Sequence, residues 1–260
     1  MSEPFIRSFV ERRDEEAWIK LLNVFHSHYY GLDFEPFSES DVEWFKRTPW
    51  WKNSGFFIAE LSGKPVGFIL FIIDKLRKPP KGYIWQFAVK PELEGSRVDE
   101  KLLRQAISQL SSAGAKAVQA SARDNMRKRI SLYRSMGFKL IRSFSTMKLK
   151  PEDMLGNIDI CGEVELKNID PLQSDDDLKI LNSVHNEAFR EHFDFRPETL
   201  EEMKAWFEDE GYEDYAVIAW LKNNPVGYVV ATISNKPSGN RPKRGYISSI
   251  GVLNRIGGGR

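Results

Sequence analysis

Cysteine is nearly absent from this chain of 260 residues. Cys161 is the only one, which excludes an intrachain disulfide and a cysteine-rich zinc site. His26 and His28 stand in an aromatic cluster that does not suggest metal ligation, so we expect no metal. A charge excess is missing as well, because 38 lysines and arginines balance 37 aspartates and glutamates. Bulk charge therefore predicts no nucleic-acid partner.

Long apolar runs are also missing. No stretch of the sequence is long enough to span a bilayer as a helix, so we expect no membrane partner. The first residues, Met1–Pro4, do not resemble a secretory signal, and we therefore expect a cytoplasmic protein. The length suits one large domain or two small ones, with enough apolar residues to fill their cores.

Hydrophobic periodicity in the first half of the chain predicts an α/β domain. Apolar, β-branched and aromatic runs predict strands over residues 5–10, 56–61, 66–71, 83–89 and 117–120. Asp14 and Ser38 each precede a run with helical periodicity, and Asp41 completes a capping box with Ser38. Further helices are predicted over 98–110 and 125–136. Loose alternation over 140–149 predicts two more short strands.

The sequence then repeats itself at an offset of roughly 160 residues, which is too long for a solenoid and indicates a duplicated domain. The repeated segments are 33–36 with 194–197, 44–45 with 206–207, 65–68 with 225–228, 82–84 with 245–247, and Val89 with Val252. We therefore predict a first domain over 1–150, a linker over 151–162 and a second domain over 163–260.

The second copy is incomplete at its C-terminus. Arg260 lies inside the turn that follows the last predicted strand, and nothing matches the first copy from Val98 to Leu149. We expect a truncated chain, or a sequence that records only part of a longer one, because a half-domain would leave a strand edge unpaired. Its apolar strand residues would then be covered by the first copy, by a second molecule in a homodimer, or by further residues.

Two segments of the first copy together resemble an enzyme family. Phe87-Ala88-Val89-Lys90-Pro91-Glu92, followed by a glycine-bearing turn, and later Asn125 with the segment 132–138, are similar to the GNAT superfamily of acyl-CoA-dependent N-acetyltransferases. The resemblance implies an α/β fold with a mixed sheet in each of two tandem GNAT-like domains. It also implies acetyl-CoA as the cosubstrate and a primary amine of a small molecule or peptide as the acceptor.

The resemblance further implies the site residues of the first copy. Tyr133 would be the catalytic residue, as the proton donor to the thiolate, although it could equally be a core tyrosine. The residues expected to bind the cofactor are Phe87, Ala88 and Val89 on the strand, Gly95, Ser96 and Arg97 in the pyrophosphate turn, and Asn125 beside the thioester.

The pyrophosphate turn of the first copy departs from the family pattern. Glu94 replaces an arginine, Arg97 replaces a glycine, and Asp99 replaces a small residue. Carboxylates would repel the phosphates, so we expect the first domain to bind acetyl-CoA weakly or not at all. Replacing Glu94 by arginine and Arg97 by glycine is expected to improve affinity. In the alternative interpretation the turn only caps the following helix.

The second copy has a turn that is richer in glycine. Gly257, Gly258 and Gly259 would present consecutive N–H groups to an anion, and with Ile250 and Val252 they are the expected cofactor-binding residues of this copy. A frayed tail is the alternative.

The helix of the second copy offers candidates for the acceptor site. The segments 185–187 and 191–194 resemble the second half of mycothiol synthase-like tandem proteins, where this region borders the acceptor pocket; an ordinary solvated helix face is the alternative. Two functions remain open: an N-acetyltransferase whose second copy is catalytic, or a non-catalytic GNAT-like scaffold that binds a ligand or a protein.

Overall fold

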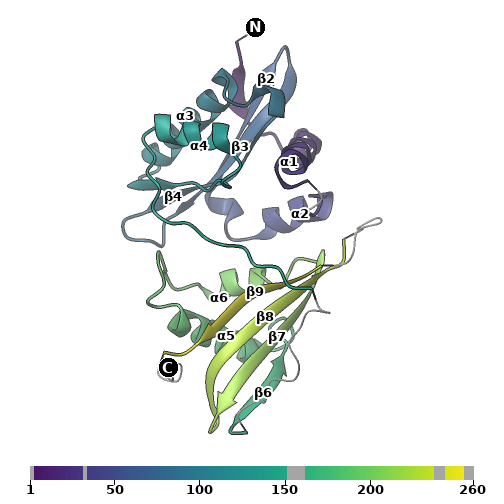
Figure 1. Ribbon diagram of the computed structural model, residues 1–260, viewed down its shortest axis with the longest axis vertical. Coiled ribbons are helices and arrows are strands. Elements are labelled where there is room, and N and C mark those ends of the chain that lie inside the picture. The colour runs from purple at the N-terminus through teal and green to yellow at the C-terminus, as the bar shows by residue number, and fades with distance from the viewer. Residues whose placement is uncertain (1–2, 32–33, 151–161, 237–243, 255–260) are drawn as a thin grey trace. The chain divides into compact units, whose positions relative to one another are not determined.

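The predicted strands and helices assemble into two units, each built on its own sheet (Figure 1). In this computed structural model the described residues are 3–31, 34–150, 162–236 and 244–254. The first unit is Met1–Lys139 and the second is Leu140–Arg260. The described strands run β1-β2-β3-β4-β5 across the first sheet and β6-β7-β8-β9 across the second.

In the first unit, helices separate the strands of a mostly antiparallel sheet. Its strands are β1 (Phe5–Ser8), β2 (Ser54–Leu61), β3 (Lys64–Asp74), β4 (Lys81–Val89) and β5 (Ala117–Gln119). Its helices are α1 (Glu15–Tyr30), α2 (Glu39–Arg47), α3 (Arg97–Ser112) and α4 (Arg127–Ser135), with short 3-10 turns at Trp51–Asn53 and Pro91–Leu93. Among the strands that the structure describes, only β5 pairs in parallel, with β4, so the sheet is mixed, as predicted.

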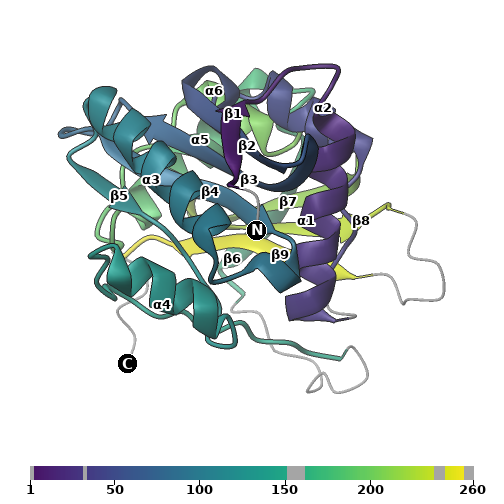
Figure 2. The ribbon, with the colours of Figure 1, turned by 90° about the horizontal axis from the view of Figure 1, so that it is seen from above.

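The continuous apolar run of β3 is explained by cover on both faces of the sheet. Ile69 and Phe71 pack in one cluster with Leu102 of α3, whereas Phe68 packs in another with Trp18 of α1. Figure 2 shows α1 and α3 on opposite sides of this sheet. A strand that is buried on both faces has a continuous run of apolar residues rather than alternating apolar and polar residues.

The second unit repeats the element order of the first, from its first strand to its fourth. Its elements are β6 (Val164–Ile169), α5 (Asp175–Ala188), α6 (Leu200–Ala205), β7 (Tyr212–Leu221), β8 (Asn224–Ser234) and β9 (Gly245–Val252). Helix α5 packs on one face of the sheet through Leu181, which is completely buried. On the other face Ile250 is 61% exposed, whereas Phe87, its counterpart in the first unit, is 6% exposed in the cluster that α3 joins.

The duplication is preserved in strand register. Gly67 lies opposite Val89 in the first unit, and Gly227 lies opposite Val252 in the second. In both units an irregularity follows three residues later, after Leu70 and after Val230. Residues can therefore be matched one by one between the units, which makes Tyr228 the counterpart of Phe68 and Ser249 the counterpart of Gln86.

In each unit an asparagine of the first helix binds the backbone of the loop before the second helix, and we call this contact the asparagine clamp. Asn23 accepts from the Phe37 N–H at 2.7 Å and donates to its carbonyl at 2.8 Å. Asn186 does the same for Glu198, at 2.8 Å and 3.0 Å. An asparagine side chain can satisfy both polar groups of one backbone residue, so it fixes the loop before the second helix. Glu198 is thus the counterpart of Phe37.

The prediction of two strands over 140–149 was wrong. The segment 138–150 forms no strand, and Leu140, Phe144 and Met147 are exposed. Apolar alternation specifies a strand only where a neighbouring edge supplies hydrogen bonds and a core covers one face. The described neighbour, β5, has three residues and pairs with β4 alone.

Removing the clamp should destabilise each unit separately. Asn23→Ala leaves the Phe37 N–H and carbonyl unpaired and should cost about 1–3 kcal/mol of unfolding free energy. Asn186→Ala should cost less, because Asn182 also donates to the Glu198 carbonyl at 2.9 Å. Urea unfolding of both variants, beside the exposed-helix controls Lys20→Ala and Lys179→Ala, checks this. Equal losses in the variants and their controls would contradict the role of the clamp.

Candidate functional site

The turn between β4 and α3 has the strand-turn-helix form that can hold an anion. Gly95 has φ of 79°, a left-handed conformation that favours glycine. Ser96 caps α3 by accepting from the Val98 N–H at 3.2 Å. Helix α3 thus begins with its N-terminal N–H groups beside this turn, as the resemblance implied.

A carboxylate of the chain itself binds an N–H group of this turn. Asp99 is 1% exposed and accepts from the Gly95 N–H at 2.8 Å and from the Glu100 N–H at 3.0 Å. Burial raises the pKa of Asp99, and the Gly95 N–H and the Arg129 cation act in the opposite direction. The Gly95 N–H is therefore already satisfied by an internal anion where the resemblance placed a phosphate.

Glu94, the other carboxylate of the turn, is held in a buried ion pair. It is 6% exposed and accepts from Arg129 of α4 at 3.3 Å and from the Tyr29 hydroxyl. Arg129 is 3% exposed, and its guanidinium carbon lies 3.7 Å from the centre of the Phe87 ring. The Arg129–Glu94 pair thus packs between an aromatic face and the turn.

Arg129 also reaches the free edge of β4. β4 pairs with β5 only over Lys81–Tyr83, and among the described strands nothing pairs with that edge beyond Tyr83. Arg129 Nη1 donates to the Phe87 carbonyl at 2.9 Å. The resemblance assigned this stretch of backbone, Phe87, Ala88 and Val89, to the pantetheine arm. In the first unit its Phe87 acceptor is taken by a side chain of the same unit.

Tyr133 and Asn125 both contact other residues of the first unit. Tyr133 is buried in the α3 core cluster, with its ring 5.2 Å from that of Phe138, and burial raises its pKa. Asn125 donates to the Tyr29 carbonyl at 3.0 Å. This geometry suits the core-tyrosine alternative; the catalytic role of Tyr133 stays a prediction. Arg97 is exposed at the start of α3.

The second unit contains a buried polar chain that the first unit lacks. His185 Nδ1 lies 2.7 Å from the Tyr228 hydroxyl, which also contacts the Ser249 hydroxyl. Burial lowers the pKa of His185 to about 4, so the imidazole is neutral. Burial and the charge of Glu198 raise the pKa of Tyr228 to about 12, against the effect of Ser249, so its hydroxyl is protonated.

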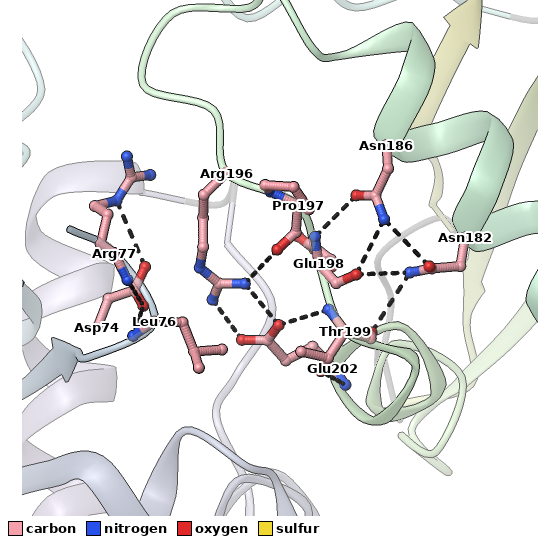
Figure 3. A network of polar contacts seen from close by, with 10 residues as sticks. All are labelled: Asp74, Leu76, Arg77, Asn182, Asn186, Arg196, Pro197, Glu198, Thr199 and Glu202. Atoms are coloured by element: carbon pink, nitrogen blue, oxygen red, sulfur yellow. Dashed lines mark hydrogen bonds and ion pairs between the residues drawn. The ribbon is translucent and has the colours of Figure 1, made fainter.

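Glu198 lies in the loop before α6, which Figure 3 shows in detail. Thr199 and Glu202 form the capping box of α6, and Arg196 donates to Glu202 at 2.7 Å. Burial and the charge of Glu202 raise the pKa of Glu198 to about 7, while Arg196 lowers it. The Glu198 Oε2 atom is buried and has no hydrogen-bond partner.

Sequence reasoning found only part of this second-unit set. It singled out the segment containing His185 but missed Tyr228, Ser249 and Glu198. The signal was present in the repeat itself, because Tyr228 replaces Phe68 within an otherwise matching segment. Of the cofactor residues predicted here, Ile250 and Val252 are exposed on β9. Gly257, Gly258 and Gly259 lie outside the described residues.

Neither a metal-binding cluster nor a membrane-spanning helix is found in the part of the chain that the structure describes. No cluster of three or more histidine, cysteine, aspartate or glutamate side chains suits a metal ion there. None of the described helices combines the length and apolar character needed to cross a membrane.

Comparisons with known sequences find a family match within the first unit. Residues 18–138 match the Acetyltransferase (GNAT) family. The mycothiol acetyltransferase of Thermobispora bispora is 28% identical over 137 residues, which cover 51% of this chain and 45% of that protein. That of Thermomonospora curvata is 28% identical over 134 residues, covering 51% and 43%. The matches span less than half the length of these relatives.

Solved structures extend the likeness of fold to the whole chain. A tandem GNAT protein from the clavulanic acid biosynthesis pathway has a TM-score of 0.70 at 14% identity, covering 98% of this chain and 81% of that chain. The GCN5-related glucosamine N-acetyltransferase region of a fungal multi-domain GH3 β-N-acetylglucosaminidase has a TM-score of 0.65 at 13% identity, covering 99% and 32%. The chain has the tandem GNAT fold, and its residues 18–138 match the Acetyltransferase (GNAT) family.

Proposed function

We propose that this chain belongs to an N-acetyltransferase that transfers an acetyl group from acetyl-CoA to a primary amine of a small molecule or peptide. The observation that carries the proposal is the tandem GNAT fold over 98% of the chain, joined to the family match of residues 18–138. The relatives named mycothiol acetyltransferase support acetyl transfer as the reaction class.

The reaction sets chemical requirements that the two units meet differently. The amine nitrogen attacks the thioester carbon, the C–N bond forms, the C–S bond breaks, and the thiolate leaves with a proton. The step needs backbone donors for the oxyanion and an acceptor for the amine proton. In the first unit Asp99 and Arg129 already occupy backbone groups that a cosubstrate would need. We therefore assign the cosubstrate to the second copy of the domain.

A non-catalytic role is the second candidate, and it applies to the first unit. Its turn and its strand edge are satisfied from within, so the GNAT fold there acts as a scaffold. A buried carboxylate and a buried guanidinium cannot make way for pyrophosphate and pantetheine without breaking an ion pair. The two candidates are compatible: a catalytic second domain and a supporting first one.

Reversing the charge of Arg97 tests this division of labour. Arg97 is exposed in the turn and would contact pyrophosphate if the first unit bound the cosubstrate. We expect calorimetric titration of the full chain with acetyl-CoA to be the same for wild type and Arg97→Glu, within about twofold. Binding that Arg97→Glu weakens by roughly tenfold, about 1.4 kcal/mol, would place the cosubstrate in the first unit. Arg104→Glu, on the exposed face of α3, is the matched control.

Breaking the buried Arg129–Glu94 pair should strongly destabilise the first unit. Arg129→Met leaves the Glu94 carboxylate buried without its cation, and we expect a loss of roughly 3–5 kcal/mol of unfolding free energy. The double variant Glu94→Gln with Arg129→Met should recover much of that loss, because no uncompensated charge remains. Denaturant unfolding measures both, with Arg104→Met as the exposed control.

The stability of the Arg129→Met variant also bears on the substitution of Glu94 by arginine that the sequence had suggested. The double change Glu94→Arg with Arg97→Gly was expected to improve affinity for acetyl-CoA, but in the structure the arginine at position 94 would be a second buried cation beside Arg129. A single Arg129→Met that costs no more than Arg104→Met would mean that the pair is dispensable and that the first unit can open.

A further inference from the structure

A pocket opens at the edge of the first sheet, beyond the end of β1. β1 pairs with β2 over Phe57–Glu60, whereas β2 begins earlier in the chain, at Ser54. No described strand pairs with that first part of β2 on the β1 side, and a pocket of about 380 Å³ lies there. A pocket of this volume can hold a small organic molecule.

Aromatic side chains line this pocket on both faces of the sheet. On the α1 face the Phe9 ring stacks on Phe56 at 4.3 Å, and the Trp51 ring lies nearly perpendicular to Phe9, with 6.2 Å between the ring centres. On the α3 face the rings of Phe57 and Phe71 line it, 5.6 Å apart. Aromatic faces attract cations, and quaternary ammonium groups are the ligands that sets of such rings recognise.

The charge of the pocket comes from a carboxylate. Among the described residues that line it, Glu11 is the only charged one, and the other polar ones are Ser8, Ser54 and Gln109. Glu11 is exposed and makes no hydrogen bond or ion pair with another described residue. Arg12, which follows it, is exposed and does not line the pocket. The pocket therefore favours a positively charged ligand over a neutral or negative one.

The other arginines near Glu11 in the chain are engaged by different carboxylates. Arg7 forms ion pairs with Asp14 at 2.5 Å and with Glu60 at 2.7 Å. Arg13 lies 3.8 Å and 3.6 Å from the same two acidic groups. Neither arginine neutralises Glu11, so its carboxylate is available to a ligand.

We propose that this pocket binds a small quaternary ammonium ion, with the aromatic rings around its methyl groups and Glu11 beside its charge. Such a nitrogen has no lone pair and cannot be acetylated, so the ligand is not an acceptor of acetyl transfer. The pocket lies at β2, and β3 separates β2 from β4, whose edge and following turn carry the GNAT resemblance. The inference is therefore independent of the proposed function.

The test uses the full chain and two probes of the same shape, choline and its uncharged analogue 3,3-dimethylbutan-1-ol. We expect choline to shift the amide NMR signals of Ser54 and its neighbours, and the neutral analogue to bind at least about tenfold more weakly. Glu11→Gln keeps the shape and removes the charge, so it should weaken choline binding about fivefold. Glu16→Gln, an exposed acid on α1 that does not line the pocket, should bind as wild type does.

A second variant distinguishes recognition of the cation from simple apolar contact. Phe57→Leu keeps an apolar side chain and removes an aromatic ring, so it should weaken choline at least about threefold and leave binding of the neutral analogue within about twofold. Equal binding of the two probes by wild type would overturn the inference. Unchanged choline binding in Glu11→Gln would overturn it as well, and so would choline shifts confined to the second unit.

Discussion

The buried guanidinium of Arg129 makes the open sheet edge of the first unit stable. β4 separates from β5 after Tyr83, and a free strand edge leaves backbone acceptors without partners. Arg129 supplies the Phe87 carbonyl with a donor, packs on its ring and neutralises Glu94. β4 and β5 therefore remain apart beyond Tyr83 while the Phe87 carbonyl keeps a donor within the unit. The closed turn at Asp99 completes the same arrangement.

The second unit has the same backbone arrangement but different side chains beneath its first helix. Its register and its asparagine clamp match those of the first, but the layer under α5 is polar where the first is apolar. In the first unit the Gly95 N–H and the Phe87 carbonyl are bound by side chains of that unit, whereas in the second the Glu198 Oε2 atom has no hydrogen-bond partner. A duplicated fold can divide its work because scaffold and site depend on different residues.

Much of the fold was accessible from sequence, because periodicity, caps and the repeat are local or regular signals. The capping box of Ser38 and Asp41 is confirmed, as are the helices that begin near Asp14 and at Arg97. The partner of Glu94 was not accessible, since Arg129 lies 35 residues away on a helix with many charges. Glu198 was missed because its burial depends on a clamp formed in three dimensions. Alternation over 140–149 misled because it carries no information about a pairing edge.

Three linked side chains of the first unit make its substitutions interdependent. Glu94, Tyr29 and Arg129 depend on one another, so losing any single member strands a buried polar group in the others. A substitution at one of the three positions therefore carries a cost in stability that a matched change at a second position can offset.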